Sequence, residues 1–405
     1  MRPRSLEACV RSLQQQFAAL EFVAPALVQY PVQCRAPAID AHDMVSGNEK
    51  LTNRRALHGF WRRSAPILLI QPLKKPDPSE TNDSAMILNP ARDSRETNEV
   101  ALLTPTYGRD LELCALLCES VDRHVSSFSK HYLLVPDCDV PLFSHFESER
   151  RTVVPASQFL PKWLRPLPSI FQRKRRQFWW SFRAKPASGW HVQQILKIAA
   201  TISLPHQRFC VLDSDVVFFR DFDLSRFEHP ATIPLLTVPD AVTSTQVRHA
   251  RWVETSHQLL GLPTPPLPAS DFIGHIIFWD QGTTRAMASK IEAVTHLGWI
   301  EALCRVREFS EYMLYGYFAQ NDAEFAAGHT PTLRTGCVSY WDSPELNETE
   351  LNRLLAGADQ HDFAFSATSF SGTPVSIIRS AIEERRSLLA PRAAAKQPAG
   401  QAALC

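Results

Sequence analysis

Short apolar runs alternate with helix-spaced apolar positions from about residue 97 onward. Residues 100–103, 132–135 and 152–154 are apolar runs that end in polar or Pro-containing loops. Asp110 stands where it can cap a helix between the first two runs. The apolar positions of that helix follow helical spacing: Leu113, Leu116, Leu117 and Val121. This strand–helix–strand rhythm predicts a parallel sheet covered by helices.

The same alternation continues downstream. Residues 190–203 have the spacing of a helix with one buried face, and residues 209–212 form another apolar run. Residues 232–238 and 273–279 are strand candidates, and residues 308–318 are helical. Pro344 after Ser343 is typical of a helix start, because proline fits the first helical position. We expect an α/β fold with a mixed, mainly parallel sheet flanked by helices.

The two ends of the chain lack this periodicity. Residues 1–96 are rich in Pro, Arg, Asn and Ser, and the last residues are rich in Ala, Pro and Gln. Such compositions bury little apolar surface. We therefore predict a poorly ordered extension and linker at residues 1–96, a folded domain at residues 97–385 and a disordered tail at residues 386–405.

Composition narrows the functional class. The 405 residues carry a formal net charge of +1, whereas a general nucleic-acid binder is usually strongly basic. The nine cysteines are scattered, and we interpret them as reduced, which favours the cytoplasm. Arg2 and Arg4 are not followed by a continuous apolar segment, so we expect no secretory signal, and no apolar run reaches 18 residues.

Two carboxylates interrupt the apolar sequence. Asp213 and Asp215 separate the apolar run 209–212 from a second run at 216–219. An unpaired buried charge is costly, and a divalent cation is a usual partner for two such carboxylates. Hard oxygen ligands suit Mg or Mn, and a turn at Ser214 would let both side chains reach one ion. The alternative is an ordinary Asp-Ser-Asp surface turn.

The segment from Phe209 to Asp215 resembles the metal-binding DXD motif of GT-A glycosyltransferases. Residues 190–197 and 308–312 also resemble motifs of a bacterial glycosyltransferase-like family of uncharacterised function, and the similarity covers about residues 98–345. The resemblance implies a GT-A-like, Rossmann-type fold and a metal-dependent enzyme of the hexosyl-transferring type. It further implies a nucleotide-sugar donor, a Mn or Mg ion held by Asp213 and Asp215, and a glycan or lipid-linked acceptor.

The resemblance also assigns candidate donor-binding residues. In such enzymes the loop after the first strand and the helix before the DXD strand face the nucleotide sugar. The alternative for each residue is an ordinary solvated loop or helix face. The predicted donor-binding set is Thr104, Thr106, Arg109, His191, Gln193, Gln194, Lys197, Asp213 and Ser214.

Three further residues are candidates for completing the site. Asp271, just before a strand candidate, could orient an acceptor hydroxyl, and Glu311 at a helix start could act as general base. His329 is the candidate third metal ligand. The alternatives are a loop aspartate, a glutamate that stabilises the helix dipole, and a loop histidine without a ligand.

Basic and aromatic residues are interleaved at residues 171–185. This stretch could form a flap over the donor or contact an anionic membrane surface, in keeping with a peripheral location at the inner face of the membrane. The alternative is a solvated basic loop whose aromatic side chains pack on the core.

Three other functions compete with glycosyl transfer. A haloacid-dehalogenase-like phosphatase also places Asp-x-Asp after an apolar strand, with Val217 fitting its pattern, but it requires a downstream acidic pair that we do not find after residue 215. A nucleotidyltransferase normally has a Gly-rich first loop, and residues 104–109 contain one glycine. A catalytically silent nucleotide-sugar-binding protein is the third alternative.

Overall fold

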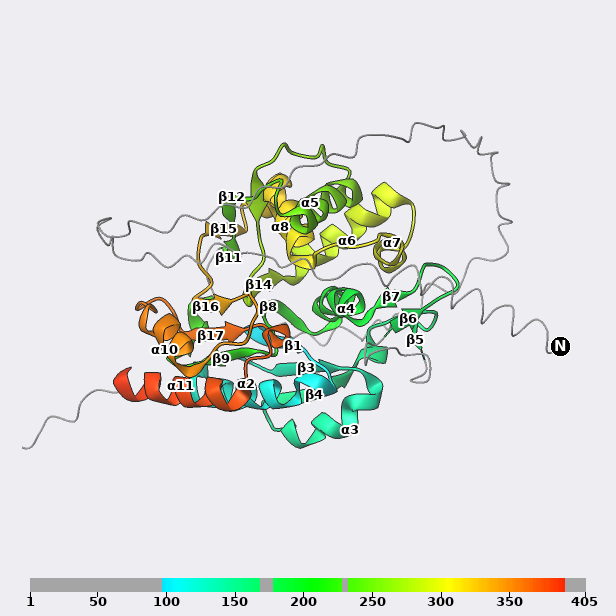
Figure 1. The fold of residues 1–405 in the computed structure, drawn as a ribbon. Coiled ribbons are helices and arrows are strands. Elements are labelled where there is room, and N and C mark those ends of the chain that lie inside the picture. Colours follow the sequence, from blue (N-terminus) through cyan, green and yellow to red (C-terminus); the bar gives the residue numbers. More distant parts are fainter. Residues whose placement is uncertain (1–96, 168–177, 228–231, 390–405) are drawn as a thin grey trace, which may run out of the picture. The chain divides into compact units, whose positions relative to one another are not determined.

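The computed structural model describes residues 97–167, 178–227 and 232–389, all within one compact unit of the chain (Figure 1). The predicted extension at residues 1–96 lies outside these residues, as do residues 171–177 of the basic aromatic stretch and residues 390–405 of the predicted tail. The domain does not stop at residue 385, because the last helix, α11, runs through Val375–Leu389.

A five-stranded sheet forms the centre, in the order β14-β8-β1-β3-β4. Neighbouring strands are parallel except for β14, which is antiparallel to β8. The predicted mixed, mainly parallel sheet is therefore confirmed. The strands are β1 (Thr97–Pro105), β3 (His131–Val135), β4 (Arg151–Pro155), β8 (His206–Leu212) and β14 (Ile276–Asp280).

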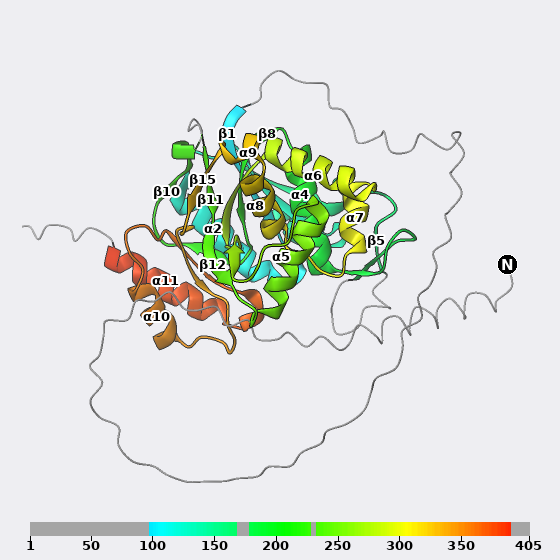
Figure 2. The ribbon, with the colours of Figure 1, turned by 90° about the horizontal axis from the view of Figure 1, so that it is seen from above.

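Helices cover both faces of this sheet (Figures 1 and 2). Helix α4 (Gly189–Ser203) lies against one face together with α6 (Gln281–Thr295) and α8 (Glu311–Asn321). Helix α2 (Leu111–His124) covers the opposite face, and α11 packs beside it. The other α-helices in the described part of the chain are α3 (Val140–Phe143), α5 (Val247–Leu260), α7 (Trp299–Arg305), α9 (Ala323–Ala326) and α10 (Glu348–Ala356).

Side-chain alternation explains why the central strands are apolar on both sides. In β8, Phe209 and Val211 pack into the cluster that contains α4, whereas Cys210 and Leu212 pack into the cluster that contains Leu117 of α2. Successive side chains point to opposite faces of a strand, and a sheet covered on both faces needs apolar residues at every position. The sequence therefore shows a continuous apolar run instead of an alternating one.

A second, three-stranded sheet begins directly after the aspartates. It contains β16 (Cys337–Tyr340), β17 (Ala364–Ala367) and β9 (Val216–Phe218), in that order, with β17 antiparallel to β9. The chain thus leaves the central sheet at Asp213 and enters another sheet at Val216. The smaller strands are β2 (Val125–Ser126), β5 (Arg165–Pro166), β6 (Phe178–Trp180), β7 (Ala187–Ser188), β10 (Phe222–Asp223), β11 (Ile233–Leu236), β12 (Val238–Val242), β13 (Ala269–Asp271) and β15 (His329–Thr332).

The predicted helix start at Ser343–Pro344 is wrong. The two residues lie in a loop and are joined by a cis peptide bond. Helix α10 begins at Glu348 instead, where the Asn347 side chain accepts a hydrogen bond from the Glu350 backbone N–H and the Glu350 carboxylate accepts one from the Asn347 N–H. This reciprocal cap satisfies two backbone donors at once. Among the described residues, no helix has the length and apolar character needed to span a membrane.

A carboxylate–histidine cluster at the end of strand β8

A tight turn brings the two aspartates to the same side of the chain. The Val216 N–H donates to the Asp213 carbonyl over 3.2 Å, which closes the turn around Ser214. Asp213 therefore continues from the central sheet while Asp215 leads into the second sheet. The predicted turn between the two carboxylates is present, and it lies at the carboxyl edge of the parallel strands, where α/β proteins commonly bind ligands.

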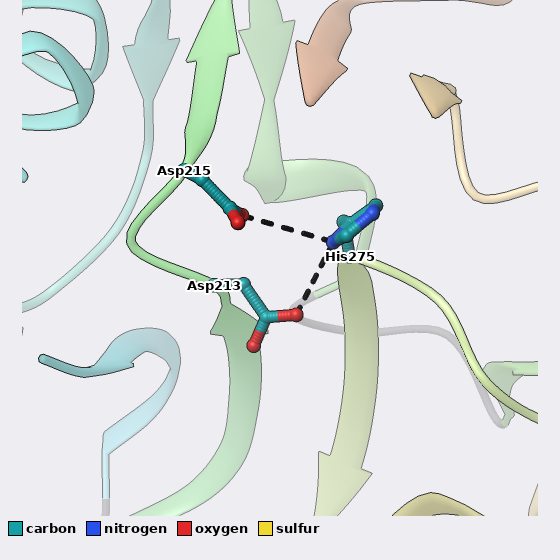
Figure 3. Close-up of side chains that lie close together, drawn as sticks. All are labelled: Asp213, Asp215 and His275. Carbon is teal, nitrogen blue, oxygen red and sulfur yellow. Dashed lines mark hydrogen bonds and ion pairs between the residues drawn. The ribbon is translucent and has the colours of Figure 1, made fainter. Parts of the chain in front are cut away.

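His275 completes the cluster, and its position follows from the direction of β14 (Figure 3). Because β14 is antiparallel to β8 and pairs Ile276 with Leu212, the residue before β14 lies beside the residue after β8. The Nδ1 atom of His275 is 3.2 Å from Asp213 Oδ2 and 3.8 Å from Asp215 Oδ1. One ligand atom from each residue fits within 4.8 Å of the others. The three residues are close enough together to share one cation.

Lys197 neutralises part of the negative charge of the carboxylates around it. Its Nζ atom donates to Asp213 Oδ1 at 3.1 Å, to Glu311 Oε1 at 2.8 Å and to the Tyr312 hydroxyl at 2.8 Å. Burial favours the neutral amine, but Asp213 and Glu311 outweigh this effect and raise the pKa of Lys197 well above its ordinary value. Lys197 is thus an internal counter-ion.

Asp213 is clamped from two directions. One carboxylate oxygen faces Lys197 and the other faces His275. Burial alone would raise the pKa of Asp213, but Lys197 and then His275 reverse the shift and hold it below the ordinary value. The Asp213 side chain is 27% exposed, compared with 10% for Asp215 and 1% for His275. Asp213 is therefore the member of the cluster that reaches solvent most.

Asp215 is held by the strand that pairs with β9. Ser366 faces Val216 in the β17–β9 register, so its hydroxyl donates to Asp215 Oδ1 at 3.0 Å, and the Ser369 N–H donates to Oδ2 at 2.9 Å. Burial, with repulsion from Asp213, still raises the pKa of Asp215, although His275 and these donors oppose the shift. The orientation of Asp215 is therefore fixed before any cation binds.

Asp110 is a further carboxylate beside the cluster. It ends the short turn Gly108–Asp110 after β1 and accepts a hydrogen bond from the Ser214 hydroxyl at 3.5 Å. Burial, followed by repulsion from Asp215, raises its pKa to about 6. Asp110 occupies the N-cap position of α2, but its side chain makes no capping hydrogen bond. The sequence prediction of a side-chain cap is wrong, because the carboxylate points toward Ser214.

The donor set of the cluster fits a divalent cation. Two carboxylates and one imidazole converge, and the carboxylates suit Mg or Mn while the nitrogen favours Mn over Mg. Among the described residues, His275 Nε2 is buried without a hydrogen-bond partner. The ring of Trp341 stacks on His275, with centroids 3.8 Å apart and planes 15° apart. Nδ1 is therefore directed at the aspartates while the rest of the imidazole is enclosed.

Several predicted donor-binding side chains are instead tied to their neighbours. The Thr104 hydroxyl is bonded to His131, His191 Nε2 donates to the Leu303 carbonyl, and the Gln194 side-chain oxygen accepts from the Glu311 N–H. These contacts link the elements around the site. Arg109 is exposed, Gln193 is half-buried, and Thr106 is buried at the end of β1.

The three candidates for completing the site also have other partners. Asp271 accepts hydrogen bonds from His249 Nδ1 at 3.0 Å and the Ile273 N–H at 2.9 Å. Glu311 is paired with Lys197. His329 accepts from the Tyr315 hydroxyl at 2.8 Å and donates to the Phe325 carbonyl at 2.8 Å.

His329, the predicted third ligand, therefore does not join the aspartates, and His275 takes that place. The sequence did contain a signal for His275. It directly precedes a buried strand, as Asp213 directly follows one. What the sequence lacked was the antiparallel pairing of these two strands, which brings the two residues together.

The fold and the cluster define an α/β protein with a candidate cation site at the carboxyl edge of a mostly parallel sheet. The chain matches a family of unknown function, DUF6492, over residues 97–388, and it belongs to that family. A comparison with curated proteins returned no match.

Two solved structures are similar to the chain at low identity. The apo form of mouse xyloside xylosyltransferase 1 is 12% identical with a TM-score of 0.37, and the match covers 68% of this chain and 99% of that chain. The apo structure of the bifunctional glycosyltransferase WbbM is 13% identical with a TM-score of 0.38, covering 69% of this chain and 46% of that chain.

Proposed function

We propose that this protein is a metal-dependent glycosyltransferase that moves a sugar from a nucleotide-sugar donor to a glycan or lipid-linked acceptor. The observation that carries the proposal is the convergence of Asp213, Asp215 and His275 within 4.8 Å at the carboxyl edge of the sheet. The sequence resemblance of the Asp213–Asp215 segment to the DXD motif supports the same conclusion. Mn or Mg is the cation that this donor set would hold.

The chain's own residues prepare the site for an anionic ligand. Asp213 and Asp215 with His275 Nδ1 would hold the cation, and when bound it would neutralise charge on the donor diphosphate. Lys197 keeps Asp213 ionised, and Ser366 keeps Asp215 in a fixed orientation, so little rearrangement is needed on binding.

In this proposal Glu311 and Asp271 are not the general base. Glu311 is 4% exposed and shares the Lys197 ammonium, and Asp271 is 4% exposed and paired with His249. A general base must reach the proton that it removes. We therefore propose that Glu311 positions Lys197, and that Asp271 holds the segment that leads to His275.

The phosphatase alternative is not favoured. A phosphatase of that type needs a further acidic pair to complete its metal site. Among the residues that the structure describes, the cluster contains no second pair of metal-binding acids. A silent binding protein would use the same site without turnover, so it is an outcome of the test below.

A thermal-shift screen of nucleotide sugars, with and without Mn²⁺, tests the proposal. A ligand that binds only the folded state raises the unfolding temperature by mass action. We expect a shift that needs both metal and nucleotide sugar, and that disappears in Asp215→Ala. The same mixtures should then release nucleoside diphosphate over time.

The outcomes of this screen separate the alternatives. Binding without release of nucleoside diphosphate, with and without glycan acceptors, supports the silent binding protein. Release of phosphate from a simple phosphomonoester that is lost in Asp213→Asn supports the phosphatase. No metal-dependent shift with any nucleotide sugar refutes glycosyl transfer at this site.

A further inference from the structure

An exposed aromatic turn lies between strands β6 and β7. Phe182 in this turn is 93% exposed, the largest fraction among the large apolar side chains that the structure describes. Its ring contacts Trp180 edge-on, with centroids 4.7 Å apart and planes 78° apart. Phe182 is thus exposed to solvent beside the half-buried Trp180, and a partner surface could supply the hydrophobic stabilisation that the exposed ring lacks. We refer to residues 180–186 as the aromatic tip.

The aromatic tip is held in place by the fold. Trp179, one residue before the tip, is 5% exposed and packs into the same core cluster as α4. Within the turn, the Ser181 hydroxyl oxygen accepts hydrogen bonds from the Arg183 N–H at 3.1 Å and the Ala184 N–H at 3.0 Å. A buried base and an internally bonded turn fix the direction of Phe182, so its exposure is a property of the fold.

Cationic side chains surround the exposed rings. Arg183, Lys185 and Arg305 line a hollow of about 490 Å³ together with Trp180 and Phe182, and none of its lining residues among those described is acidic. Glu301 pairs with both arginines from one side. The three cationic side chains and Glu301 together carry a net charge of +2, next to the exposed Phe182 ring. The tip therefore combines an apolar centre with a cationic border.

We propose that the aromatic tip docks on the surface of an anionic phospholipid bilayer. Phe182 and Trp180 would enter the interfacial region, where aromatic rings are favoured, and the three cations would contact lipid phosphates. A nucleic acid fits less well, because the chain as a whole carries a net charge of only +1. An acidic protein surface would match the positive charge, but it would not by itself offer the apolar environment that the exposed Phe182 ring favours.

The tip is connected to the candidate site through one helix. Strand β7 ends at Ser188, whose hydroxyl accepts a hydrogen bond from the His191 N–H and so caps helix α4. Lys197 of the same helix contacts Asp213. A bilayer at the tip would therefore lie at the start of the helix that reaches the carboxylate–histidine cluster. The docking proposal does not depend on the proposed enzymatic function, because it rests on the tip alone.

Vesicle co-sedimentation of the full chain tests the proposal. We expect the protein to bind phosphatidylglycerol-containing vesicles and to bind pure phosphatidylcholine vesicles at least tenfold more weakly. Phe182→Ser should weaken binding about tenfold, and Arg183→Gln with Lys185→Gln should weaken it about fivefold for each charge removed. Phe370 is 68% exposed elsewhere on the surface, and Phe370→Ser is the matched control that should bind as the wild type does.

Three results would overturn the proposal. The first is equal binding to neutral and anionic vesicles, and the second is no binding to either. The third is a pair of results: Phe182→Ser binds as the wild type does, and binding is lost when the four basic residues at 173–176 are changed to glutamine. That pair would assign the membrane contact to residues 173–176. Far-ultraviolet circular dichroism of each variant confirms that the fold is retained.

Discussion

Two histidines are buried beside charged groups at the central sheet, and their surroundings differ in how completely they are satisfied. His131 of β3 accepts a hydrogen bond from Arg151 Nε at 3.1 Å, and its other ring nitrogen is bonded to the Thr104 hydroxyl at 3.0 Å. Arg151 in turn donates two hydrogen bonds to Asp122. Burial, with Arg151 nearby, lowers the pKa of His131 well below its ordinary value.

In the cluster at the end of β8, the hydrogen-bonding groups and charges are not fully paired. His275 Nε2 has no partner among the described residues. Asp213 and Glu311 share the single ammonium of Lys197, while Asp215 lies near His275 Nδ1. Asp110 adds another carboxylate nearby. One cluster pairs one guanidinium with one carboxylate, whereas the other has more carboxylates than cations. The difference teaches that burial of charge alone does not mark a site. The excess of carboxylates makes the cluster at the end of β8 the candidate cation site, whereas the charges around His131 are already balanced.

Substitutions that change the charge balance of the two clusters should have their largest effect on metal binding. Asp215→Asn removes one charged ligand, and we expect Mn²⁺ affinity, measured by calorimetric titration, to fall at least 100-fold. Asp122→Asn makes the same chemical change in the balanced cluster and should leave Mn²⁺ affinity unchanged. Equal affinities for the wild type and Asp215→Asn would show that the aspartates hold no metal.

The next effect is on stability. Arg151→Met leaves His131, Asp122 and the Cys118 carbonyl without their donor, and we expect the free energy of unfolding in urea to fall by about 2 kcal/mol. Lys197→Met makes a similar change beside Asp213. Its loss should shrink when Mn²⁺ is added, because the metal replaces part of the missing charge, whereas the loss in Arg151→Met should not. A metal-independent loss in both variants would contradict the contrast.

A smaller effect is expected at Asp110. Asp110→Asn removes a charge that repels Asp215, so the metal-free protein should gain about 1 kcal/mol of stability while Mn²⁺ affinity falls by roughly threefold to tenfold. Glu112→Gln, an exposed change two residues away, is the control and should alter neither quantity. Unchanged stability and affinity in Asp110→Asn would place Asp110 outside the cluster's electrostatic field.

The smallest effect concerns a third buried histidine. His206 is bonded to Tyr132 and Ser129, and burial lowers its pKa to about 4. A histidine with a lowered folded-state pKa contributes stability above its unfolded pKa of about 6.5 and loses it as pH falls toward 4. Between pH 7 and pH 5, His206→Gln should therefore lose less stability than the wild type, by roughly 1 kcal/mol or more. Parallel urea curves at the two pH values measure this, and identical losses would refute it.

Much of the fold could be predicted because its signals are local. The apolar runs at β1, β3, β4 and β8 and the helical spacing of α4 are contained within short windows of sequence, and each is confirmed. The prediction of a helix start at Ser343–Pro344 also relied on a local signal, the preference of proline for the first helical position, and it was wrong. The cap that Asn347 and Glu350 form sets the start of the helix instead.

The sequence by itself determined that two carboxylates follow a buried strand and that a turn separates them, because these residues are contiguous. Only the tertiary structure decided what surrounds them. His275 reaches Asp213 through the antiparallel pairing of β14 with β8, and Ser366 reaches Asp215 through a strand some 150 residues later. The physical reason is that apolar periodicity reports which face of an element is buried, whereas strand order and direction depend on packing between segments far apart in the chain.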